Sequence, residues 1–203
     1  MPTRRTADER KGAFLAAKRN ILAIDPGTTQ SAYCVLQPGY SIIAAAKVPN
    51  DDLHALIARG GMDEMVIECM EPRFLGGQKT AGQMIGSETY ETCIWIGRFI
   101  EQAMQLGMPV HRVYRSEERS RLIPSKRNKL PPLPAGSGQT ADAQIRAALI
   151  QRFAQHDKKN GKGTTKCRDT FYGFKADMWN AFAVGVVYLD REREKALKTA
   201  LNG

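Results

Sequence analysis

Two short apolar segments of this chain each end in a carboxylate, and this pattern restricts the possible folds more than any other feature. Ile21–Asp25 reads Ile-Leu-Ala-Ile-Asp, and Met65–Glu68 reads Met-Val-Ile-Glu. Short apolar runs of this kind are typical of strands buried in the sheet of an α/β domain. A carboxylate at the end of a buried strand is costly unless a partner compensates its charge. We therefore expect the two acids to share a cation.

A third acid lies near the C-terminus, where Asp177 opens a long apolar stretch and Asn180 follows three residues later. This spacing places the two side chains on one face of a helix. Each acid also has a simpler interpretation. Asp25 precedes a Pro-Gly turn, Glu68 can be a solvated strand end, and Asp177 can be a helix N-terminal charge favoured by the dipole. The order of the three acids along the chain favours a shared metal site.

Apolar periodicity and turn residues predict the element order β-β-β-α-β-α-β-α-α, in which the first three strands form an antiparallel meander. We expect residues 20–203 to form one domain after a basic segment, residues 1–19, that is a helix, a DNA-binding arm or disordered. Residues 116–138 are expected to be irregular. The predicted strands are Ile21–Asp25, Ser31–Leu36, Tyr40–Val48, Met65–Glu68 and Pro109–Tyr114, and the predicted helices are Asp51–Arg59, Ser87–Leu106 with Ser87 as N-cap, Thr140–Gln155 and a last helix from Lys175.

The net charge of +9 is concentrated in one part of the chain. Residues 121–168 contain eleven Lys or Arg against two Asp, which suits a nucleic acid backbone, although a solvated loop has the same composition. No apolar run approaches the ~20 residues of a membrane span, and residues 1–20 lack a signal-peptide pattern. We therefore expect a cytoplasmic protein. The four cysteines form no C-x-x-C pair, so zinc is not expected.

Four motifs in sequence order resemble those of the RuvC family of Holliday junction resolvases, in a divergent, bacteriophage-type form. They are Ile24-Asp25-Pro26-Gly27, Val66-Ile67-Glu68, Gly136-Ser137-Gly138-Gln139-Thr140-Ala141-Asp142, and Asp177-Met178-Trp179-Asn180-Ala181-Phe182-Ala183-Val184. The resemblance implies a ribonuclease H-like fold, with a mixed five-stranded sheet, its first three strands antiparallel, and helices on both faces. It also implies an Mg²⁺-dependent endodeoxyribonuclease that resolves four-way junctions by paired symmetric nicks.

The same resemblance implies two Mg²⁺ or Mn²⁺ ions held by Asp25, Glu68, Asp177 and Asn180, without a nucleotide cofactor. The sequence departs from the family at two of its positions. Asn180 replaces the last acid, although an amide oxygen can still ligate a metal. Asp142 stands where members have a lysine. Asp169 is an alternative ligand.

The resemblance also suggests residues that contact branched DNA. The loop after Glu68 contains Phe74, which is our candidate for insertion at the junction centre unless it packs against its own domain. Phosphate contacts are expected from basic residues, some of which can replace the missing lysine. These candidates are Arg73, Lys79, Arg115, Arg119, Lys126, Arg127 and Lys175.

The helix over residues 87–106 has two apolar stripes, whereas packing on a sheet needs one. In the family this helix forms the homodimer interface, which is consistent with the near two-fold symmetry of a four-way junction. We expect Trp95, Ile96 and Phe99 at that interface. Alternatively, residues 116–138 cover the second stripe.

Two other functions remain open at this point. Ile24–Ser31 resembles the phosphate-binding hairpin of Hsp70-like and actin-like ATPases, but those proteins need two such domains. A non-catalytic junction-binding protein is the other alternative, with Asn180 as the sign of lost activity.

Overall fold

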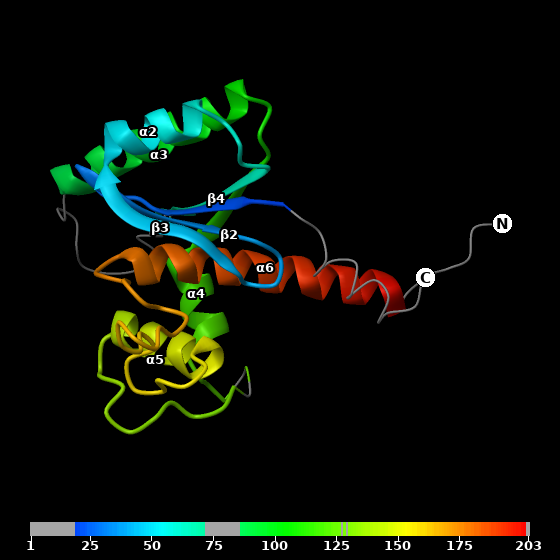
Figure 1. The fold of residues 1–203 in the computed structure, drawn as a ribbon. Helices are drawn as coiled ribbons and strands as arrows, with labels where there is room; N and C mark the ends of the chain where they lie inside the picture. The colour runs from blue at the N-terminus through cyan, green and yellow to red at the C-terminus, as the bar shows by residue number, and fades with distance from the viewer. Residues whose placement is uncertain (1–18, 72–85, 127, 129, 202–203) are drawn as a thin grey trace, which may run out of the picture.

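The structure is a computed structural model that describes residues 19–71, 86–126, 128 and 130–201. Its centre is one sheet with the strand order β3-β2-β1-β4-β5 (Figure 1). The strands are β1 (Ile21–Asp25), β2 (Gln30–Leu36), β3 (Ile42–Pro49), β4 (Glu64–Cys69) and β5 (Val110–Tyr114). β1, β2 and β3 pair antiparallel, whereas β4 pairs parallel with both β1 and β5. The predicted mixed five-stranded sheet is therefore confirmed.

Helices cover both faces of the sheet, as the sequence predicted. On one face lie α2 (Asn50–Ala58) and α3 (Ser87–Gln105), and on the other lies α6 (Met178–Leu201), with α4 (Arg115–Leu122) and α5 (Ala141–Phe153) packed beside it (Figure 1). Alternation along the strands divides the core accordingly: Ala23 faces α6, whereas Leu22 and Ile24 face α2 and α3. Asp25, two residues after Ala23, therefore points toward α6.

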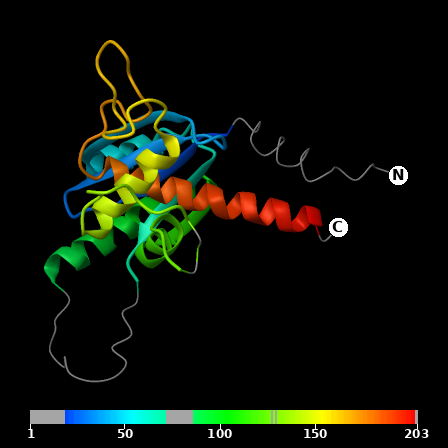
Figure 2. The same ribbon diagram turned by 90° about the horizontal axis from the view of Figure 1, so that it is seen from below.

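The final helix holds the fold together. Residues 178–189 of α6 are almost all buried against the sheet, and the charged second half extends beyond it, as Figure 2 shows from below. Gly185 allows the close approach, because a Cβ there would lie 2.6 Å from a methyl group of Leu36. Among the described residues, no helix is long and apolar enough to cross a membrane.

Two local predictions were wrong. Residues 116–138 were expected to be irregular, but residues 116–122 belong to helix α4, although the segment Arg-Ser-Glu-Glu-Arg-Ser-Arg-Leu has almost no apolar periodicity. Its helical state depends on packing against α5 and α6. In addition, α3 is preceded by Gly86 at its N-cap, and Ser87 makes no capping hydrogen bond.

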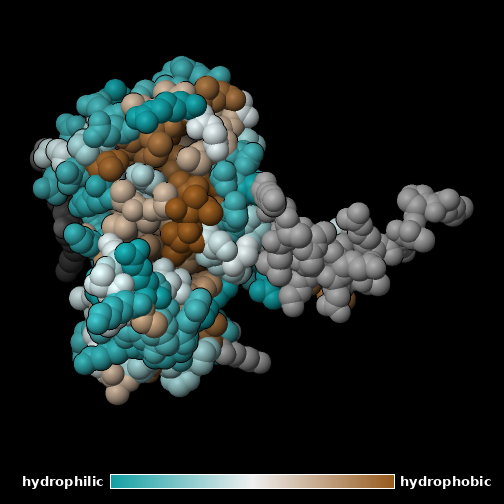
Figure 3. All heavy atoms as spheres, viewed as in Figure 1, coloured by the Kyte–Doolittle hydropathy of each residue, from teal (hydrophilic) through white to brown (hydrophobic). Residues whose placement is uncertain are grey.

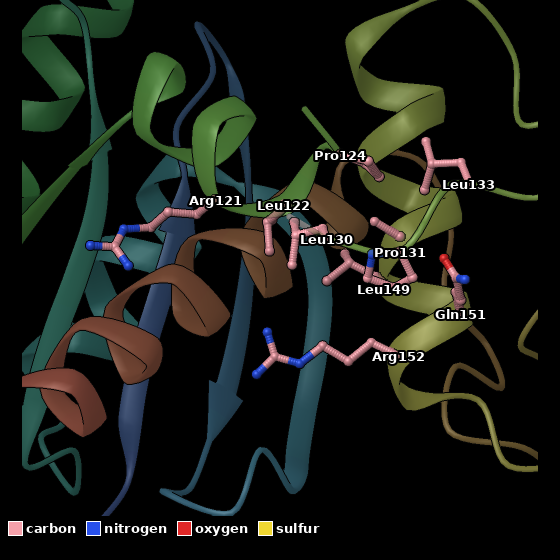
Figure 4. A pocket seen from close by; sticks show the side chains of 10 residues that line it. Arg121, Leu122, Pro124, Leu130, Pro131, Leu133, Leu149, Gln151 and Arg152 are labelled. Atoms are coloured by element: carbon pink, nitrogen blue, oxygen red, sulfur yellow. The ribbon is translucent and has the colours of Figure 1, made fainter. Parts of the chain in front are cut away.

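The chain after α4 closes onto α5 and leaves a pocket of about 230 Å³ between them (Figure 4). Its lining is mainly apolar, with Arg121 and Arg152 at its side, and none of the predicted catalytic residues contributes to it. Pro124, Leu130, Pro131 and Leu133 therefore line a pocket beside α5, and α4 before them packs on α5 and α6. β3 forms one edge of the sheet, and its residues are exposed or partly exposed. In the view of Figure 3, apolar side chains gather across the middle of the molecule.

Candidate active site

A braced turn fixes Asp25 at the end of β1. The Gly27 N–H donates to Ser31 Oγ at 3.1 Å, and the Ser31 hydroxyl donates to Asn50 Oδ1 at 2.6 Å. The Asn50 amide in turn donates to the carbonyl oxygens of Gly27 and Thr28 at 3.0 and 3.1 Å. The turn needs glycine, because a Cβ at residue 27 would lie 2.3 Å from the Gln30 carbonyl oxygen. The amide of Gly27 is thus already bound within the turn instead of facing a phosphate.

Asp25 and Glu68 lie side by side because β1 and β4 are parallel neighbours in register, with Ile24 opposite Ile67. Burial and the neighbouring carboxylates of Glu68 and Asp177 raise the pKa of Asp25 well above its usual range. Its carboxyl group hydrogen-bonds to Glu68 and also interacts with the side chain of Asn180. Asp25 therefore lies beside Glu68 at the end where β1 and β4 stop, and it interacts electrostatically with Asp177 and Asn180.

Glu68 differs from Asp25 in its cationic surroundings. Burial raises the pKa of Glu68, whereas the positive charges of Arg115 and Arg119 and the hydrogen bond from Asp25 oppose that shift. Two adjacent acids in one poorly solvated place share protons instead of both ionising. A bound cation would remove that repulsion, and carboxylate and amide oxygens are the ligands that Mg²⁺ prefers. By donor chemistry, the residues present fit a hard divalent ion.

Asp177 forms an ion pair with Lys47 of β3. The Lys47 ammonium donates to Asp177 Oδ2 at 2.5 Å, in an ion pair whose side chains keep 36% and 43% of their surface exposed. Consistent with this, no group of three or more His, Cys, Asp or Glu side chains within the described chain is arranged to hold a metal ion. The paired acids Asp25 and Glu68 form the centre of the site, and Asp177 lies at its solvent edge.

A further carboxylate, Glu118, lies behind the cluster. Its side chain is completely buried in α4, and burial together with the negative charge of Glu68 raises its pKa to about 9. Its Oε2 accepts from Arg115 at 2.8 Å, whereas its Oε1 has no hydrogen-bond partner in the described structure. Arg115 also forms an ion pair with Asp142 at the start of α5. Arg115 thus joins α4 and α5 next to Glu68.

The arrangement of sheet and helices is similar to that of solved RuvC structures. One structure, of Thermus thermophilus RuvC in complex with a Holliday junction substrate, matches with a TM-score of 0.55 and 13% identity, over 88% of this chain and 97% of that one. The chain has the RuvC fold. A second structure, Thermus thermophilus RuvC alone, matches with a TM-score of 0.51 and 14% identity, over 87% and 97% of the two chains.

A Fowlpox virus resolvase with Holliday junction DNA matches with a TM-score of 0.42 and 15% identity, over 85% of this chain and 98% of that one. No protein-family model matches the sequence, and no curated protein matches it either. The two RuvC structures confirm the predicted ribonuclease H-like fold, although their identity to this chain is only 13% and 14%.

On this RuvC fold, the predicted DNA-binding residues lie in different environments. Arg119 is exposed on α4 and acts on Glu68 through its charge, and Lys126 and Lys175 are exposed. The guanidinium of Arg115 is instead held by two carboxylates. Four further candidates lie outside the described residues, namely Arg73, Phe74, Lys79 and Arg127.

The residues expected at a dimer interface mostly face inward in this structure. Phe99 is fully buried and Ile96 is nearly so, both against β1 and β4, and Trp95 packs at the margin of the same core, where the Arg98 guanidinium lies over its ring at 4.0 Å. The outward stripe of α3 is formed by other residues. Its large apolar members, Tyr90, Ile94 and Met104, are 56% to 66% exposed.

Sequence reasoning missed two residues of the site. Glu118 occurs in a segment that was expected to be irregular, so nothing in its pattern indicated burial. Lys47 reaches the site only through the pairing of three strands, and alternation of β3 gave a weak signal for the face on which it lies.

Proposed function

We propose that the protein is a divalent-cation-dependent endonuclease that cuts branched DNA, with four-way junctions as its main substrate. The observation that carries this proposal is the position of Asp25 beside Glu68 at the ends of two parallel neighbouring strands, within interaction range of Asp177 and Asn180, on the RuvC fold. The similar Thermus thermophilus RuvC structure is bound to a Holliday junction substrate, which supports the choice of substrate.

Asp25 and Glu68 would hold the cations, with Asp177 and Asn180 as further oxygen ligands. When bound, a pair of Mg²⁺ or Mn²⁺ ions activates a water molecule and stabilises the leaving 3′-oxygen of a phosphodiester. The loss of one charge at Asn180 leaves Asp177 as the sole anionic ligand from this part of the chain, so its carboxylate becomes more important.

The protein's own contribution is to position and balance charge. The braced turn at Gly27 fixes Asp25, and the charges of Arg115 and Arg119 favour the ionised form of Glu68. Arg119, exposed beside these acids, is the residue we expect to contact a phosphate near the cut. The basic residues of 121–168, together with Arg73 and Lys79, would supply the wider phosphate contacts, and Phe74 would insert at the junction centre.

A homodimer would present two such sites to the two-fold symmetry of a junction and allow paired symmetric nicks. The outward stripe of α3, with Tyr90, Ile94 and Met104, is the surface we propose for that contact. Ile96 and Phe99 would then support the interface from within the protomer, and Trp95 would lie at its margin.

The experiment that tests this function compares a labelled four-way junction with a linear duplex of the same sequence. We expect paired nicks at symmetric positions in the junction with Mg²⁺, and no cleavage of either substrate in EDTA. Binding of the junction without cleavage under any divalent ion would instead support a non-catalytic junction-binding protein. Cleavage that is equally fast in the linear duplex would contradict selectivity for branched DNA.

A further inference from the structure

Lys47 is held at the acidic cluster by the register of three strands. Asp25 of β1 lies opposite Ala32 of β2, and Ala32 lies opposite Lys47 of β3. These positions share one face of the sheet, because Ala23, Ala32 and Ala45 all contact the core around α6. Neighbouring strands are about 4.8 Å apart, so the backbones of Asp25 and Lys47 are separated by roughly 10 Å.

The ammonium group of Lys47 contacts the carboxylate of Asp177, the residue directly before α6. The contact is 2.5 Å, and the Asp177 carboxylate is close enough to Asp25 to raise its pKa. Lys47 is therefore a cation at the solvent-facing edge of the same cluster. Arg115, by contrast, is only 23% exposed and is bound by two carboxylates.

The Lys47–Asp177 ion pair is weak enough for another cation to replace Lys47 at Asp177. Both side chains are more than one-third exposed, and exposed ion pairs of this kind are weak. A divalent ion that binds Asp177 competes with Lys47 for the negative charge of this carboxylate. Once displaced, the flexible ammonium remains at the entrance to the site, where a DNA phosphate would lie next to the bound ions.

We propose that Lys47 is an active-site residue with two alternating partners: the Asp177 carboxylate in the metal-free protein, and a phosphate of the DNA substrate once a divalent ion occupies Asp177. This inference rests on the proposed function, because it assigns a residue to the same site. It also predicts that Lys47 weakens ion binding in the absence of DNA and strengthens DNA binding in the presence of ions.

The first test is calorimetric titration of Mn²⁺ into the DNA-free protein, with wild type, Lys47→Gln and Lys195→Gln. Lys195 is the matched control, since it pairs with Glu192 far along α6 and loses the same charge. We expect Lys47→Gln to bind Mn²⁺ about two- to fivefold more tightly than wild type, since an exposed ion pair contributes up to about 1 kcal/mol and 1.4 kcal/mol is tenfold. Lys195→Gln should match wild type.

Equal affinity in Lys47→Gln and Lys195→Gln, while wild type binds Mn²⁺, would overturn the role of Lys47 and leave the proposed function intact. Absence of Mn²⁺ binding in wild type would overturn both, because the acidic cluster would then not be a cation site.

The second test is the salt dependence of junction binding, measured without divalent ions and with Ca²⁺. With Ca²⁺, Lys47→Gln should lower the magnitude of the slope of log affinity against log salt by about 0.9, the contribution of one phosphate contact. Without ions its slope should equal that of wild type, because Lys47 is then held by Asp177. An unchanged slope with Ca²⁺ would overturn the phosphate contact.

Discussion

The contact between α6 and the sheet leaves no room for a side chain at Gly185. The effect of an added methyl group on the free energy of unfolding tests this packing. In Gly185→Ala the new Cβ would lie 2.6 and 2.8 Å from the two methyl groups of Leu36 and 3.1 Å from Ala23 Cβ. Leu36 and Ala23 are completely buried, so they cannot move into solvent. Overpacking of this kind costs about 1–3 kcal/mol, whereas alanine in place of glycine within a helix gains about 1 kcal/mol.

Gly97 provides the matched control, because it also lies inside a helix but a Cβ there meets nothing within 4 Å. Gly97→Ala should therefore raise the free energy of unfolding by about 1 kcal/mol. Gly185→Ala should leave it unchanged or lower it by up to about 2 kcal/mol, so that the two variants differ by about 1–3 kcal/mol. Urea unfolding of both variants measures this difference. A Gly185→Ala protein as stabilised as Gly97→Ala would refute the close packing of α6 on β1 and β2.

Three further predictions concern catalysis, binding and acid stability. Asp25→Asn should abolish junction cleavage while junction affinity in a gel-shift titration stays near wild type, because binding depends on the basic surface; cleavage at the wild-type rate would show that Asp25 is not catalytic. Junction affinity should fall steeply with salt, by about 0.9 in log affinity per log salt for each phosphate contact, and a flat response would argue against a phosphate-contacting surface.

Asp169 is buried, which alone would raise its pKa, but the backbone N–H groups of residues 155–157 and 170 lower the pKa below its usual range. Because the pKa is lower in the folded state, the Asp169 carboxylate stabilises the protein fully above the unfolded pKa of about 3.9. This contribution is lost as the pH falls from that value through the lower folded pKa. The stability difference between wild type and Asp169→Asn in thermal unfolding should therefore shrink between pH 6 and pH 3; a constant difference would contradict this assignment.

Local sequence patterns were sufficient to predict the sheet and the neighbouring positions of Asp25 and Glu68. The apolar runs that end in Asp25 and Glu68 determine two neighbouring strands, and parallel pairing then places the two carboxylates at the same edge. Asp177 and Asn180 were added because the sequence predicted a helix that includes both, whereas α6 begins at Met178, directly after Asp177. Each of these inferences uses residues that are close in sequence or strands with a clear hydrophobic pattern.

Residues whose position depends on long-range packing could not be predicted in this way. Glu118 is buried although its helix is almost entirely charged, because α4 is enclosed by α5, α6 and β5. Lys47 is brought to Asp177 by the register of an edge strand with mixed exposure. Similarly, both stripes of α3 are apolar, so periodicity alone did not decide that Phe99 faces the sheet and Ile94 faces outward.

The most direct test of the proposed site is to locate the divalent ion itself, by anomalous X-ray diffraction from crystals of the protein grown with Mn²⁺. The proposed function predicts anomalous density coordinated by carboxylate oxygens of both Asp25 and Glu68, at oxygen distances of roughly 2.0–2.2 Å, similar to those of Mg²⁺ sites. It also predicts that Asp177 has turned from Lys47 toward the ion. Density at another group of residues, with Asp25 and Glu68 still bound to each other, would contradict the proposal that this acidic cluster is the catalytic centre.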